Sequence, residues 1–116
     1  MQDSKILLSQ DELSLAKNKD VILTKNAVIR KVVSEFAELA GKFQKIAENY
    51  HDIFPNETFL IPPKISKGEQ HEELPYVMLD YPRIFSKENV FAIRCFFWWG
   101  NFFSFTLHLK GSYKEQ

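Results

Sequence analysis

The most chemically varied stretch of the chain is Asp80-Tyr81-Pro82-Arg83, which places a carboxylate, a phenol and a guanidinium at the end of an apolar run. Such groups could line a small-ligand or enzymatic pocket between a helix and a sheet, because ligand sites combine apolar walls with a few polar groups. The residues predicted to line this pocket are Tyr76, Asp80, Arg83 and His108. We favour the simpler interpretation, in which Asp80 and Arg83 pair with each other or cap a turn.

A metal site would have to be built from His51, His71 and His108. The run His71-Glu72-Glu73-Leu74-Pro75 imitates the opening of a zincin motif, but Pro75 stands where that motif needs its second histidine. Proline also breaks the helix that would present both ligands. Histidines distant in sequence could still converge in space. We nevertheless interpret these as ordinary surface and sheet histidines, and we predict no metal and no cofactor.

Cys95 is the single cysteine, and with His108 and Asp80 it could form a nucleophilic site. Cysteine catalysis needs a thiolate beside a base, and the sulfur must be accessible. A lone cysteine in a strand is more often a small buried hydrophobe. We therefore predict no catalytic residue. One cysteine also excludes an internal disulfide, which is in keeping with a cytoplasmic protein.

The charge of the chain bears on two classes of partner. Fifteen Lys and Arg residues balance fifteen Asp and Glu residues, so the formal net charge is zero. Nucleic-acid binding depends on neutralising phosphates, so nucleic acid is an unlikely partner. Stacking aromatics and cations would nevertheless share one sheet face: Arg94, Phe96, Trp98, His108 and Lys110. No apolar run approaches the roughly 20 residues needed to span a bilayer, so we also expect no membrane partner.

A long amphipathic helix is predicted over about residues 21–53. Its most regular apolar positions recur every seven residues: Ile22, Ile29, Phe36, Phe43 and Tyr50. Further apolar residues three and four positions on lie on the same side of the helix. About thirty residues span roughly 45 Å, whereas a compact domain of this size has a radius of gyration of only about 13–14 Å. The helix must therefore bend, break near Gly41, or extend past its own domain.

A short helix is predicted before the long one, from Gln10 to about Asn18. Ser9 and Glu12 form a capping box at its start. Asp20 is then predicted to cap the long helix.

Three segments follow the long helix and precede the C-terminal hairpin. Residues 59–61 could form a short strand, and residues 64–73 are polar enough to be an exposed loop. Residues 74–81 are predicted to be an edge strand or an extended segment, because Pro75 and Pro82 cannot donate to a ladder.

The C-terminal part predicts an aromatic β-hairpin, over about residues 90–99 and 102–110. A two-residue turn at Gly100-Asn101 would pair Trp99 with Phe102. A register one residue longer sorts the side chains better, and we favour it because a buried face usually dictates register. That register gathers the following residues on one face: Phe91, Ile93, Cys95, Phe97, Trp99, Phe103, Phe105, Leu107 and Leu109.

These elements predict one α+β domain over residues 1–116, with two N-terminal helices packed on an antiparallel sheet of about three strands. Aromatic residues remain on both faces of the hairpin tip, whereas the helices can cover only one face. The other face needs another segment, a ligand or a second copy, because large exposed apolar patches are uncommon on monomers. We therefore predict a non-catalytic interaction or accessory protein that forms a homodimer through its aromatic hairpin or long helix. The predicted contact residues are Phe96, Trp98, Trp99 and Phe102.

Overall fold

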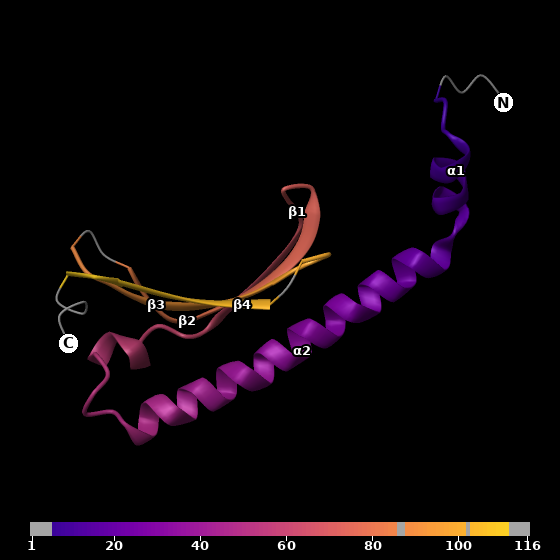
Figure 1. Cartoon of the computed structure of the whole chain (residues 1–116). Helices are drawn as coiled ribbons and strands as arrows, with labels where there is room; N and C mark the ends of the chain where they lie inside the picture. Colours follow the sequence, from indigo (N-terminus) through magenta and orange to yellow (C-terminus); the bar gives the residue numbers. More distant parts are fainter. Residues whose placement is uncertain (1–5, 86–87, 102, 112–116) are drawn as a thin grey trace.

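The structure is a computed structural model of the chain, and it describes residues 6–85, 88–101 and 103–111. Two α-helices lead into a four-stranded antiparallel sheet of order β1-β2-β3-β4 (Figure 1). The elements in chain order are α1 (Gln10–Lys17), α2 (Lys19–Asn49), the 3-10 helix η1 (Asn56–Phe59), β1 (Lys64–His71), β2 (Leu74–Phe85), β3 (Val90–Trp98) and β4 (Phe103–Lys110). The predicted α+β fold, with a long second helix and an aromatic C-terminal hairpin, is confirmed.

The start of each helix is fixed by a side-chain cap. The Ser9 amide donates to Glu12 Oε1 at 2.8 Å and the Glu12 amide donates to Ser9 Oγ at 3.1 Å, so the predicted capping box is confirmed. The predicted cap of α2 is wrong by two residues. Asn18 is the N-cap, and its Oδ1 accepts from the Asp20 amide at 3.1 Å. A single residue therefore joins α1 to α2.

The apolar stripe of α2 packs on the middle of the sheet. Ile29, Phe36 and Ala40 are buried against β2 and β3, where they meet Val77, Leu79 and Cys95 among others. Lys25 anchors the helix over β1 through an ion pair with Glu69. The helix is continuous through Gly41, so it does not break there.

Two predictions about the segment between α2 and β2 are wrong. Residues 56–59 form η1 instead of a strand over 59–61, and residues 64–71 form β1 instead of an exposed loop. β1 is polar because it is an edge strand whose side chains are mostly exposed or half-buried.

The predicted edge strand over residues 74–81 is in fact β2, which lies inside the sheet between β1 and β3. Its prolines are tolerated because they avoid the regular part of the ladder. Pro82 falls in the register shift between Asp80 and Arg83, past the last pair with β1, which is Lys64 with Asp80.

The hairpin adopts the register that sorts the side chains. Phe97 pairs with Phe103, Cys95 with Phe105 and Ile93 with Leu107, so the prediction of one shared apolar face is confirmed. The connection is longer than two residues, and Gly100 takes a φ of +77° in it, a conformation that glycine adopts without steric cost.

The molecule is elongated. Its radius of gyration is 19.8 Å and its extents are 66 × 28 × 23 Å, well beyond the roughly 13–14 Å expected for a compact domain of this length. The first turns of α2 and all of α1 project away from the sheet (Figure 1). Of the three ways to accommodate the long helix, the chain uses extension past the sheet.

Two glycines are expected to respond oppositely to alanine. A Cβ on Gly41 would meet nothing within 4 Å, so Gly41→Ala should stabilise the fold by about 0.5–1 kcal/mol through helix propensity.

A Cβ on Gly68 would lie 2.6 Å from Cε1 of Tyr76. That ring also contacts His71 and Phe96, so Gly68→Ala should destabilise by about 1–3 kcal/mol. Urea unfolding at one fixed protein concentration measures both, and equal shifts of the same sign would contradict this account.

Candidate functional site

The most conspicuous feature of the surface is an apolar strand face on β4, formed by Phe103, Phe105 and Leu107. These side chains lie on the side of the sheet that faces α2, because their partners Phe97, Cys95 and Ile93 do. Yet Phe105 is 67% exposed, and Phe103 and Leu107 are each 58% exposed. The strand face is thus built like a core surface but is left open to solvent.

The strand face is open because of where α2 crosses the sheet. The helix packs on β2 and β1, and its one ring contact with β4 among the described residues is between Phe36 and Phe103, whose centroids lie 6.2 Å apart. Phe105 and Leu107 lie further along β4. The loop after α2 returns to the sheet only at Phe54, which stacks on Phe91 with a centroid distance of 6.0 Å. Most of β4 therefore has no helix above it.

The aromatic residues predicted for the interface do not lie together on one surface. Phe96 and Trp98 lie on the opposite face of the sheet, where they form an outer aromatic cluster with His71 and Tyr76. Ring centroids of His71 lie 5.2 Å from Phe96 and 5.1 Å from Trp98, and Trp98 Nε1 donates to the His71 carbonyl at 2.9 Å. The chain thus packs these two aromatics on itself.

The other two predicted interface residues are differently placed. Trp99 is partly buried against the helix-side core, and its ring lies 6.4 Å from that of Phe97. Phe102 lies outside the described residues.

The four residues predicted to line a pocket are brought together only in part. Asp80 and His108 line one hollow of about 140 Å³ on the outer face of the sheet, together with Phe85, Ala92, Arg94 and Thr106. Tyr76 belongs to the outer aromatic cluster. The guanidinium of Arg83 points elsewhere and donates through Nε to the Pro62 carbonyl at 2.7 Å.

The partner of Asp80 is Arg94 and not Arg83. Arg94 donates through Nε to Asp80 Oδ1 at 2.8 Å and through Nη2 to Asp80 Oδ2 at 3.2 Å, so the pair is bidentate. The hydrogen bond to Asp80 raises the pKa of Arg94 despite partial desolvation. The two residues face each other across β2 and β3, so only the strand register could have revealed this pair.

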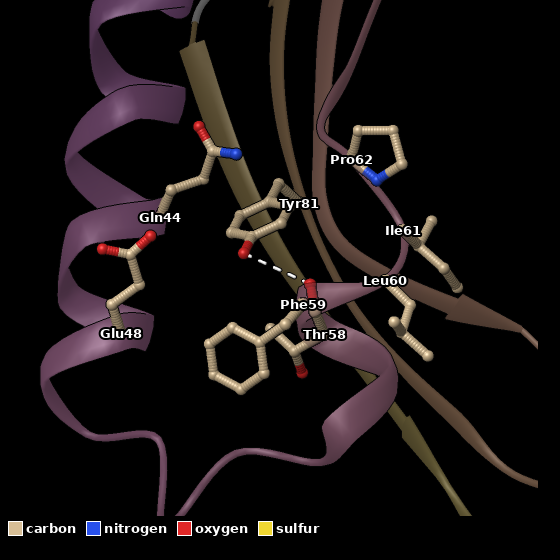
Figure 2. Close-up of a pocket in the computed structure, with 8 residues that line it drawn as sticks. All are labelled: Gln44, Glu48, Thr58, Phe59, Leu60, Ile61, Pro62 and Tyr81. Carbon is tan, nitrogen blue, oxygen red and sulfur yellow. Dashed lines mark hydrogen bonds between the residues drawn. The ribbon is translucent and has the colours of Figure 1, made fainter.

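A second hollow, of about 200 Å³, lies between α2, η1 and β2 (Figure 2). Gln44 and Glu48 reach into it from successive turns of α2, while the Tyr81 hydroxyl donates to the Thr58 carbonyl at 3.3 Å. Burial, and then the nearby charge of Glu48, raise the pKa of Tyr81, so the phenol stays a donor. Thr58 Oγ1 is buried and has no hydrogen-bond partner among the described residues. This arrangement suits water or a small molecule with N–H groups. No sequence pattern indicated this hollow, because η1 was not predicted.

Cys95 is unsuited to nucleophilic catalysis. It is 1% exposed on the helix side of the sheet, whereas His108 lies in the hollow of the opposite face. Burial, with a smaller contribution from the charge of Asp80, raises the pKa of Cys95 to about 11. The sulfur therefore remains a thiol at neutral pH, and a thiol is a poor nucleophile.

Within residues 6–85, 88–101 and 103–111, no three His, Cys, Asp or Glu side chains gather closely enough to hold a metal ion. No helix in the same ranges is both long and apolar enough to cross a membrane.

Comparisons with protein-family models, curated proteins and solved structures find no match to this chain. The strand face of β4 departs from the surface of an ordinary monomer, on which large exposed apolar patches are uncommon.

The buried thiol predicts a specific pH dependence of stability. Because the folded pKa of Cys95 is about 11 and its ordinary value is about 9, the unfolded chain releases this proton first as the pH rises. The stabilisation is present below pH 9 and is lost toward pH 11. Between pH 7 and pH 10 the free energy of unfolding should fall by about 1.4 kcal/mol more in the wild type than in Cys95→Ala. Denaturant titrations at both pH values measure this difference. Tyr81 is present in both proteins, so its own contribution to the pH dependence cancels. Parallel pH profiles would contradict it.

Proposed function

We propose that this chain is a non-catalytic interaction protein that forms a homodimer through its C-terminal hairpin and long helix. The observation that carries the proposal is the exposed apolar strand face of β4, formed by Phe103, Phe105 and Leu107. The contact is thereby assigned to the helix-facing side of the hairpin, and not to Phe96 and Trp98.

The sequence pattern of β4 supports this assignment. Apolar and polar residues alternate strictly along Phe103–Lys110, which is the pattern of a strand with one buried and one solvated face. In the single chain the apolar side of this pattern remains exposed. Aromatic side chains bury about 150–250 Å² each, so Phe103 and Phe105 together leave on the order of 250 Å² of aromatic surface in water.

The C-terminal end of the long helix also carries exposed apolar residues. Leu39 and Ile46 lie seven residues apart, which keeps them on one side of α2. Ile53 follows after a further seven residues, in the turn past the end of the helix. Leu39 is half-buried against the core, whereas Ile46 and Ile53, just past the end of α2, are exposed. The apolar stripe therefore continues beyond the part that the chain's own sheet covers.

A second copy of the chain is the partner that we propose. Soluble oligomers are mostly symmetric assemblies of identical chains, and in a two-fold dimer the same patch is used twice. A reciprocal contact would thus cover both strand faces at once. The formal net charge of the chain is zero, so its overall charge favours neither an acidic nor a basic partner.

We expect Phe105→Glu to weaken self-association at least tenfold, because burying a phenylalanine contributes about 1.5–3 kcal/mol and the variant would also bury a charge. Thr106→Glu is the matched control, since it introduces the same side chain at the next position, on the opposite face of β4. Light scattering over a range of protein and salt concentrations measures the mass. The wild type should be a dimer at all salt concentrations, because the contact is apolar.

A wild-type chain that stays monomeric at every concentration would overturn the proposal. So would a dimer that Phe105→Glu and Thr106→Glu affect equally. Circular dichroism of both variants provides the control for folding, and both should match the wild type because both positions are exposed.

A further inference from the structure

We infer that the strand face of each copy is covered by the N-terminal arm of the other copy, where the N-terminal arm is residues 7–23. This inference rests on the proposed function and names the segment that makes the contact. The arm comprises the approach to α1, all of α1 and the first turn of α2. In the resulting dimer the two arms would be exchanged around a two-fold axis.

The first observation is that the arm is apolar but unburied. Leu7, Leu15, Ile22 and Leu23 are each more than half exposed. None of the residues of α1, all of which the structure describes, is buried. The apolar residues of the arm are all exposed or half-buried: Leu7, Leu8, Leu13, Leu15, Ala16, Val21, Ile22 and Leu23.

The second observation is that α1 is a well-specified helix without a surface to support it. It has eight residues, a complete capping box at its start and Lys17 in its last turn. An isolated helix shorter than about 12–15 residues is marginal in water, and helices of this length depend on packing of an apolar face. The caps fix where α1 begins, so a docking surface for it is the missing component.

The third observation is that the arm lies far from the strand face of its own chain. α2 is a continuous 31-residue helix, about 46 Å long, and the arm lies at the end that projects beyond the sheet (Figure 1). The ion pair between Lys25 and Glu69 holds the next turn of α2 at the edge strand β1. β4 is at the other edge of the sheet.

The two surfaces complement each other in kind. β4 offers an apolar sheet surface without a helix, and the arm offers apolar helical residues without a sheet. Exchange between two copies uses each surface twice, so two arms and two strand faces of a few hundred Å² each reach roughly the 1,200–2,000 Å² of a stable interface. Exchange of an identical element between copies is a common route to dimers.

The test uses the full chain with substitutions in the arm. Leu15→Glu combined with Ile22→Glu should weaken the dimer at least tenfold, as Phe105→Glu does. Ser14→Glu combined with Thr24→Glu is the matched control, because it adds the same charges at exposed polar positions beside them and should leave the dimer unchanged. Sedimentation equilibrium gives the dissociation constants, and circular dichroism checks that helix content is retained.

A mixing experiment then tests whether arm and strand face meet between copies. The arm variant keeps an intact strand face, and Phe105→Glu keeps an intact arm. An equimolar mixture should therefore form a heterodimer through one intact contact, although neither variant dimerises alone. Native mass spectrometry separates this heterodimer from both homodimers by mass.

Each other result has a definite meaning. If the arm variant remains a dimer while Phe105→Glu is a monomer, the strand face self-associates without the arm. The inference then fails and the proposed function stands. A mixture that stays monomeric also overturns the inference. If the wild type itself is a monomer, both fail.

Discussion

The structure depends on a mismatch of widths between one helix and the sheet that it covers. An α-helix with its side chains is about 10–12 Å across, whereas four strands that each occupy a width of about 4.8 Å form a sheet roughly 19 Å wide. One helix therefore covers about two strands of a four-stranded sheet. Here α2 lies over β2 and β1, and Val77 and Leu79 at the centre are completely buried. The outermost strand on the other side, β4, is left with a core-like face in solvent.

The apolar side chains on the opposite face of the sheet are partly covered without a second layer of helices. In Figure 1 the β1–β2 hairpin curls away from α2, toward the outer face. There the rings of His71, Tyr76, Phe96 and Trp98 pack on one another. The Asp80–Arg94 pair lines a hollow of this face together with Ala92. Aromatic residues on both faces of a hairpin therefore do not by themselves imply two interfaces. The curl of the sheet lets one face cover itself, whereas the helix side has no comparable cover over β4.

Local patterns predicted the elements that follow a strict period, and they failed where tertiary position decides. The heptad spacing of α2, the Ser9 capping box and the alternation of β4 are properties of a few neighbouring residues, and all three were predicted. β1 escaped detection because an edge strand needs few apolar residues, and β2 was assigned to an edge because of prolines that lie outside the regular ladder. The Asp80–Arg94 pair requires the register between two strands. To predict the exposure of Phe105, one must know which strand α2 leaves uncovered, and no local sequence pattern contains this information.

The length of α2 separates the arm from the part of the sheet that lacks a helix. A shorter helix would let α1 fold back toward β4 of the same chain, and the sheet would then have a second helix within one copy. With 31 residues in α2 and a single residue, Asn18, between the helices, α1 and the start of α2 project beyond the sheet (Figure 1). The chain thus carries an uncovered sheet surface and an exposed helix at separate places, and neither is buried within one copy. Because association would bury surface that only the folded chain presents, dimerisation would also stabilise the fold by mass action. Folding of the arm and recognition of the partner would then be one event.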